Sequence, residues 1–285
     1  MTIIFDGIAS GMLLFLISVG LSVTLGLMNF VNLAHGAFAM LGGYVCVMLL
    51  NGWGMPFLAT LPIVIIVSAL TGIILERTLY RRLYTASPLD QILFSIGLVF
   101  MAIAAAHYAF GAQQQPLLLP SFLQGQINLP GLDMGIYRLF LILLGLSIAG
   151  LLQWTVAHTR FGGQLRAAVD NQATARGMGI DVNRIFSLTF ALGSALAGLG
   201  GALGVELLGL DPEFPVKYLV YFLIVVVVGG SGSIKGSLIA AIMLGVADVA
   251  GKYYVPQVGS FVIYAVMIAT LILRPQGLFG RSPTR

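Results

Sequence analysis

The chain has 285 residues, of which 59% are hydrophobic and only 8% are charged, and its mean hydropathy is +1.00. A soluble core of this length does not need so much apolar sequence, so the composition predicts an integral membrane protein. The net charge of +4 is explained by membrane topology rather than by binding to nucleic acid. The one cysteine, Cys46, excludes an internal disulfide and a four-thiolate metal site, and we expect it to be a small buried side chain.

Membrane spans are the elements that the sequence predicts first, because about 20 apolar residues cross about 30 Å of hydrocarbon. Nine segments qualify, at 7–27, 33–50, 57–76, 90–110, 137–157, 185–208, 216–229, 234–250 and 258–273. The segment at 33–50 is interrupted by glycines and the one at 216–229 is short, which is typical of broken or re-entrant helices. We therefore expect an all-α helical bundle in one domain, 1–285, with nine spans, or with eight if a marginal segment turns back.

Lysines and arginines are divided unevenly between the two faces of this predicted bundle. Three of the 14 lie on one face, at Arg138, Lys217 and Lys252, and the other eleven lie on the opposite face. Cytoplasmic loops carry the excess of positive charge. The N-terminus is therefore predicted to be outside and the C-terminus cytoplasmic.

Polar residues mark the start of the glycine-interrupted segment. Asn29, Asn32 and His35 precede Gly36 there. A helix break within a membrane leaves backbone groups that need partners, and the two asparagines can supply them. Asn32 and His35 are candidates for lining a pathway, and the alternative for His35 is a structural hydrogen bond that holds the break together.

The largest predicted outer loop, 111–136, has prolines at 116, 120 and 130 and no lysine or arginine. Two interpretations remain open for this loop. It can receive a partner or cover a pore, or it can be a connector that its prolines stiffen.

The segment 158–184 is the longest stretch that is too polar for hydrocarbon, and its four arginines predict a cytoplasmic location. Small and apolar residues recur there at helical spacing, at Leu165, Ala168, Val169, Gln172, Ala175 and Met178. We expect one short helix that ends at Gly177 and Gly179, followed by a second helix that Asp181 caps. A helix with small residues on one face between two spans is typical of a docking surface.

Small residues also recur four apart in the span 185–208, including Gly193 and Gly201. Such a pattern allows close helix packing, either inside the bundle or between subunits. Two acids in the spans, Glu206 and Asp248, are candidates for lining the outer mouth of a pathway, and the alternative is that each lies at the interface or pairs with a helix end.

The glycine-rich stretch Gly229–Ser237 contains Gly230 and Gly232. It has neither the Walker order nor the strand context of a nucleotide-binding loop. A serine protease site at Ser231 would need a histidine base, which is expected in a later span, and all three histidines precede this serine. A tight turn between packed helices is the favoured interpretation.

Three stretches resemble one family. They are Arg166–Ile180, Asn29–Phe38 and Val228–Ser237, and the ending Arg274–Phe279 extends the likeness over most of the chain. These stretches are similar to the branched-chain amino acid permeases of ABC importers, of the LivH type. The resemblance implies a dimeric permease whose cytoplasmic helix binds an ATPase subunit, with a second permease, identical or homologous, and a substrate-binding protein on the outer face.

By this resemblance the chain is a transport subunit of the bacterial inner membrane, and ATP is bound by its partners. The expected docking residues are Arg166, Ala168, Asp170, Asn171, Ala173 and Gly179. Glycines at 36, 193, 201, 230 and 232 are expected at helix breaks and close contacts. The alternatives are an ion-coupled carrier, for which no pair of central acids is present in the sequence, and the intramembrane protease.

Overall fold

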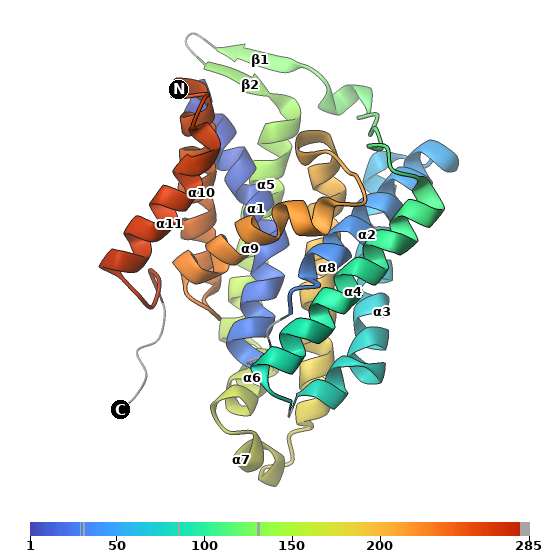
Figure 1. Ribbon diagram of the computed structural model, residues 1–285, viewed down its shortest axis with the longest axis vertical. Coiled ribbons are helices and arrows are strands. Elements are labelled where there is room, and N and C mark those ends of the chain that lie inside the picture. Colours follow the sequence, from blue (N-terminus) through green and yellow to red (C-terminus); the bar gives the residue numbers. More distant parts are fainter. Residues whose placement is uncertain (29, 31, 85, 130–131, 280–285) are drawn as a thin grey trace.

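The computed structural model describes residues 1–28, 30, 32–84, 86–129 and 132–279 (Figure 1). Asn29 in the predicted helix break and Pro130 in the outer loop lie outside the described residues. Two arginines of the C-terminus, Arg281 and Arg285, also lie outside them.

The described chain is mostly helical, and each of the nine predicted segments corresponds to a helix. These helices are α1 (Thr2–Met28), α2 (His35–Val47), α3 (Phe57–Thr78), α4 (Pro88–Phe110), α5 (Ile136–His158), α8 (Val182–Leu208), α9 (Phe214–Gly229), α10 (Ile234–Tyr254) and α11 (Val262–Leu273). A π-helical turn, η1 (Met48–Gly52), extends α2. The shorter elements are η2 (Tyr80–Leu83), η3 (Ser121–Leu123), α6 (Arg160–Asp170), α7 (Gln172–Gly177) and η4 (Gly259–Phe261).

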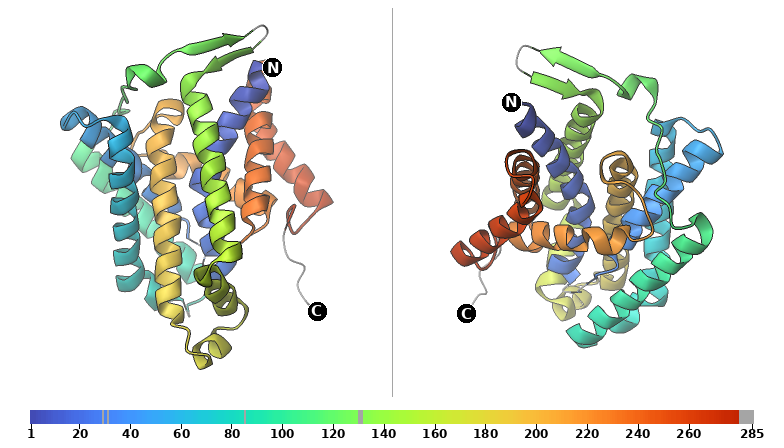
Figure 2. Two further views of the ribbon diagram at one scale, coloured as in Figure 1. Left: turned by 180° about the vertical axis from the view of Figure 1, so that it is seen from behind. Right: turned by 45° about the horizontal axis from the view of Figure 1, so that its top comes forward.

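Among the described residues, seven helical segments are long and apolar enough to cross a membrane, and the apolar helices at Phe214–Gly229 and Gly259–Leu273 are shorter. This arrangement confirms the predicted polytopic helical membrane protein. Helix α9 lies across the bundle in front of α1 and α8 instead of running along them (Figures 1 and 2). This segment is one continuous helix of 16 residues, which is short for a full crossing, as the sequence indicated.

Helices α1 and α8 form the centre of the bundle. In the most apolar stretch of each, 83% of the residues are buried, against 28% in α3, 22% in α4 and 17% in α5. The three outer helices expose large apolar side chains, as expected for surfaces that face lipid. The core is therefore organised around α1 and α8, with α2, α3 and α10 packed directly on them.

Small residues bring these central helices together. A Cβ atom added at Gly201 of α8 would overlap the carbonyl oxygen of Ala39 in α2, and one added at Gly20 would overlap the carbonyl oxygen of Gly193. The predicted ridge of small residues thus lies inside the bundle of one chain. At the start of α2, a Cβ on Gly36 would lie 3.0 Å from the Cα atom of Pro215, so the beginnings of α2 and α9 are in contact.

The turn between α9 and α10 is formed by glycines with left-handed backbone. Gly230 has φ 90° and Gly232 has φ 80°, a conformation that glycine adopts at low cost. The Gly232 N–H also donates a hydrogen bond of 3.0 Å to the carbonyl oxygen of Ser22 in α1. This turn is consequently fixed against the end of the central helix.

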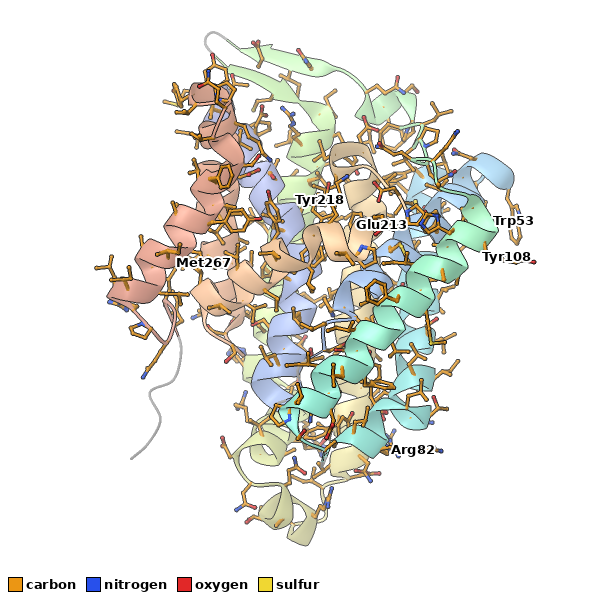
Figure 3. All side chains as sticks on the ribbon, viewed as in Figure 1. Trp53, Arg82, Tyr108, Glu213, Tyr218 and Met267 are labelled. Carbon is orange, nitrogen blue, oxygen red and sulfur yellow. The ribbon has the colours of Figure 1, made fainter. Side chains whose placement is uncertain are left out.

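The predicted outer loop, 111–136, contains a short antiparallel hairpin, β1 (Gln126–Leu129) and β2 (Leu132–Gly135), which was not expected from the sequence. It lies at the end of the molecule that carries the N-terminus, opposite α7 (Figure 1). Arg82 lies toward the α7 end, whereas Trp53 and Tyr108 lie nearer the hairpin end (Figure 3). Four-residue strands are too short for a period-2 pattern to stand out in the sequence.

Candidate functional site

The segment between α5 and α8 folds into two helices, not into the one helix that the sequence predicted. Asn171 separates them, with φ −157° and ψ 103°, and its Oδ1 accepts a hydrogen bond of 2.9 Å from the Thr174 N–H. An asparagine side chain competes for backbone donors and so favours a cap over a helix interior. The prediction of a helix continuing through residues 171 and 172 is therefore wrong. Side-chain caps begin all three helices of this region: Thr159 for α6, Asn171 for α7 and Asp181 for α8.

Three apolar side chains hold α6 and α7 against the rest of the chain. Leu165, Ala168 and Ala175 are 1%, 0% and 1% exposed. These three members of the predicted apolar face therefore face this chain, whereas Gln172 and Met178 of the same predicted face are exposed. Ala168 cannot be a docking contact, because its side chain is fully buried, and that prediction is corrected.

Arg166 and Asn171 also have partners inside the chain. The Arg166 guanidinium donates from Nη1 to the carbonyl oxygen of Val156, near the end of α5. The last carbonyls of a helix lack helical partners, and a basic side chain can satisfy one of them. The structure thus gives Arg166 a capping role at α5 and Asn171 a capping role at α7, and the docking contacts predicted for both stay predictions.

The exposed surface of this region lies mainly on α7 and on the turn that follows it. We call this surface the α7 tip; it consists of Gln172, Ala173, Thr174, Arg176, Gly177, Met178 and Gly179, all exposed. Met178 is 74% exposed and is the one large apolar side chain of the α7 tip. Gly179 has φ 82° and open space around its Cα. Asp170 is exposed just before the tip, at the end of α6.

Asn32 and His35 hold the chain between α1 and α2. The Asn32 Oδ1 accepts hydrogen bonds from the Ala34 N–H at 3.1 Å and from the Tyr80 hydroxyl at 2.9 Å. His35 Nε2 lies 2.7 Å from the carbonyl oxygen of Ile17 in α1. Both residues are 1% exposed, so in this conformation they stabilise the helix break and do not line an open path.

Glu206 and Asp248 lie in different surroundings and are not brought together. Glu206 lines a cavity of about 420 Å³ beneath the hairpin, together with Asp133 and Arg138. Asp248 is 7% exposed, and its Oδ2 accepts a hydrogen bond of 2.6 Å from Lys252. The structure therefore places Glu206 at the cavity beneath the hairpin and Asp248 in an ion pair within α10.

A second cavity, of about 440 Å³, separates α4 from α2 and α3. Its lining is almost entirely apolar and includes Phe38, Leu75, Leu98 and Met101, with Tyr44 and Phe110 stacked at a ring distance of 4.2 Å. Helix α4 makes few contacts with the rest of the bundle. This cavity is thus bounded on one side by a helix that is weakly attached.

Glu76 was not predicted as a site residue, and its side chain is fully buried at the end of α3. Its carboxylate accepts a hydrogen bond of 2.9 Å from the Tyr84 hydroxyl, another from Ser187 in α8, and an ion pair of 3.4 Å from Arg81. Burial and the neighbouring Glu76 carboxylate raise the pKa of Tyr84, so its phenol stays protonated and donates. The signal in the sequence was an acid at the last position of a predicted span, with Arg81 five residues later.

The chain is similar in sequence to known permease proteins over almost its whole length. Residues 3–271 match the family described as "Branched-chain amino acid transport system / permease component". The chain is 27% identical to the high-affinity branched-chain amino acid transport system permease protein BraD of Pseudomonas aeruginosa, over 97% of this chain and 94% of that protein. It is also 27% identical to LivH of Escherichia coli, with the same coverage.

A probable branched-chain amino acid transport permease protein LivH of Methanocaldococcus jannaschii is likewise 27% identical, over 94% of this chain and 89% of that protein. No solved structure matches the chain. The match over residues 3–271 includes the central helices, the short helix α9 and the α7 tip. The chain therefore belongs to the family of permease components of branched-chain amino acid transport systems.

Proposed function

We propose that this chain is a transmembrane permease subunit of an ABC importer that moves amino acids, chiefly branched-chain and other aliphatic ones, across the inner membrane. Family membership over residues 3–271 is the observation that carries this proposal. The names of the relatives from Pseudomonas aeruginosa and Escherichia coli supply the substrate class. The chain itself would carry out no catalysis, because separate subunits would bind and hydrolyse ATP.

We further propose that an ATPase subunit binds the α7 tip. Exposed small residues such as Ala173 and Gly179 allow close approach of a partner, and Met178 offers an exposed apolar side chain. The buried side chains of α6 and α7 fix the tip to the bundle, so a force on the tip would reach α8. This arrangement fits a subunit that is moved from the cytoplasmic side.

The other proposed partners are a second permease subunit, identical or homologous, and a substrate-binding protein on the outer face. Three groups of arginines support a cytoplasmic α7 end: Arg77, Arg81 and Arg82, the arginines of α6 to α8, and Arg274. This orientation would place the N-terminus and the hairpin outside. The hairpin is then the outer surface nearest to a binding protein.

Ala173→Arg tests the docking proposal. Because Ala173 is exposed on α7, a large charged side chain there should block a closely fitting partner and leave the fold intact. We expect the ATPase subunit to co-purify with the wild-type chain and about tenfold less with the variant, a loss of about 1.4 kcal/mol in binding. Uptake of radiolabelled leucine into vesicles that contain all subunits should fall in parallel.

The matched control is Ala112→Arg, the same substitution at an exposed residue of the outer loop. It should leave co-purification of the ATPase unchanged. Equal co-purification of the ATPase with both variants would refute docking at the α7 tip. Uptake that persists without any ATPase subunit would instead favour an ion-coupled carrier.

A further inference from the structure

Glu76, Arg81, Tyr84 and Ser187 form what we call the Glu76 cluster. It joins the end of α3 and the segment after it to the first turns of α8. The Arg81 guanidinium spans the cluster, since its Nη2 lies 3.4 Å from Glu76 Oε2 and 3.0 Å from the Ser187 Oγ atom. The carboxylate thus has partners on both elements, and none of the interactions described above for the proposed function uses it.

Stability alone does not explain a buried carboxylate at this position. Removing an ion from water is costly, and replacement of a buried ion pair by apolar residues is often neutral or stabilising. Glu76 is fully buried, and apolar side chains such as Leu75 and Phe190 lie close along the same helices. The hydrogen bonds of the carboxylate are directional, unlike apolar contacts, and so they select one register of α8 against the end of α3.

One side of the cluster is connected to the α7 tip. The Ile180 N–H donates a hydrogen bond of 3.0 Å to the carbonyl oxygen of Ala175, and Asp181 caps α8. These bonds tie α7 to the start of α8. Ser187 lies five residues after Val182, about 8 Å along a helix with a rise of 1.5 Å per residue.

The other side of the cluster is connected to the break before α2. Tyr80 lies in η2 between Glu76 and Tyr84, and its hydroxyl donates to Asn32 Oδ1 at 2.9 Å. The Phe30 ring packs edge to face on Tyr80 and Tyr84, at ring distances of 5.3 Å and 5.9 Å. Phe30 and Asn32, which lie between α1 and α2, therefore contact directly the segment that the cluster holds.

We propose that Glu76 is a positioning residue for transport, which fixes α8 to η2 so that movement of the α7 tip reaches the break before α2. The inference rests on the proposed function, because the movement would originate at the bound ATPase. Glu76 acts through Ser187 on one side, and through Tyr80 and Asn32 on the other. Its loss disconnects ATP hydrolysis from substrate movement and leaves the docking surface in place.

The ratio of leucine taken up to ATP hydrolysed tests this inference. Vesicles would contain the chain with its ATPase, second permease and binding protein, and both quantities would be measured on the same sample. Glu76→Gln keeps the size of the side chain and removes the charge that faces Arg81. We expect the ATPase to remain bound and the ratio to fall about fivefold or more, the lower end of typical coupling between sites.

Two further variants separate positioning from folding. Ser187→Ala removes the hydroxyl on α8 that donates to Glu76, and Tyr84→Phe removes the phenol hydroxyl that donates to it. Both variants should lower the ratio of leucine taken up to ATP hydrolysed, as Glu76→Gln does. The matched control is Ser147→Ala, because Ser147 is exposed on α5 and donates only to the carbonyl oxygen of Leu143 in its own helix. Its ratio should equal that of the wild type.

Uptake and hydrolysis that fall in proportion would overturn the inference, because a merely structural defect leaves the ratio unchanged. If Glu76→Gln does not assemble with the ATPase, the inference is tested by the uptake-to-hydrolysis ratios of Ser187→Ala and Tyr84→Phe. Wild-type ratios for both variants would overturn the inference. A wild-type chain that shows no ATP-dependent uptake would refute the proposed function, and with it this inference. The two failures are distinguishable, because failure of the proposed function is seen in the wild-type chain, whereas failure of the inference is seen only in the variants.

Discussion

At Gly201 the backbone of α8 lies so close to Ala39 of α2 that no side chain fits between them. The spacing of small residues in the sequence predicted such a contact, and the structure supplies the partner helix. The capping roles of Arg166 and Asn171, in contrast, were not predicted from the sequence. Their partners are backbone groups of Val156 and Thr174, and which backbone group a polar side chain will meet depends on the folded chain. The partners of Glu76 are instead side chains, those of Arg81, Tyr84 and Ser187, and they too come together only in the folded chain.

Gly201→Ala should destabilise the bundle, because the added methyl group overlaps a carbonyl oxygen that cannot move without shifting α2. Overpacking of this kind costs about 2 kcal/mol. Thermal unfolding of the detergent-solubilised protein should therefore begin at a lower temperature than in the wild type. Gly150→Ala is the matched control, since a Cβ there meets no atom within 4 Å. An equal melting temperature for both variants would contradict the close packing.

The helices were largely predictable as elements. Each of the nine apolar segments became a helix, because about 20 apolar residues in a membrane protein have few other ways to satisfy their backbone. The direction of α9 could not be predicted, since it depends on contacts with α1, α2 and α10. The division between α6 and α7 was missed because the apolar spacing continues across Asn171, whereas the cap at Asn171 interrupts the backbone.

Asn171→Ala should loosen α7 without affecting the membrane helices. Loss of a side-chain cap costs about 1 kcal/mol. Local opening of α7 should then increase about fivefold. Limited trypsin cleavage at the exposed Arg176 in membrane vesicles measures this opening, and the variant should be cut correspondingly faster. Gln172→Ala, at the next residue, is exposed and caps nothing, so it should be cut at the wild-type rate; equal rates for both variants would show that the cap has no such role.

On the scale of the whole molecule, the structure has two ends joined by a central pair of helices. The α7 tip and the Glu76 cluster lie toward one end, and the hairpin with its cavity lies at the other (Figures 1 and 3). Helix α8 runs from the first to the second, and it contacts α1, α2 and α3 on the way. A movement imposed on α7 can therefore reach α2 and the short helix α9 through contacts within this chain.

We propose above that ATP hydrolysis by partner subunits drives amino-acid movement through this chain. The most direct measurement is uptake of radiolabelled leucine, isoleucine and valine into vesicles that contain the complete complex, with ATP or with a non-hydrolysable analogue. We predict accumulation with ATP and none above the level of protein-free vesicles with the analogue. Equal accumulation in both conditions, or accumulation that follows an imposed ion gradient, would contradict the account.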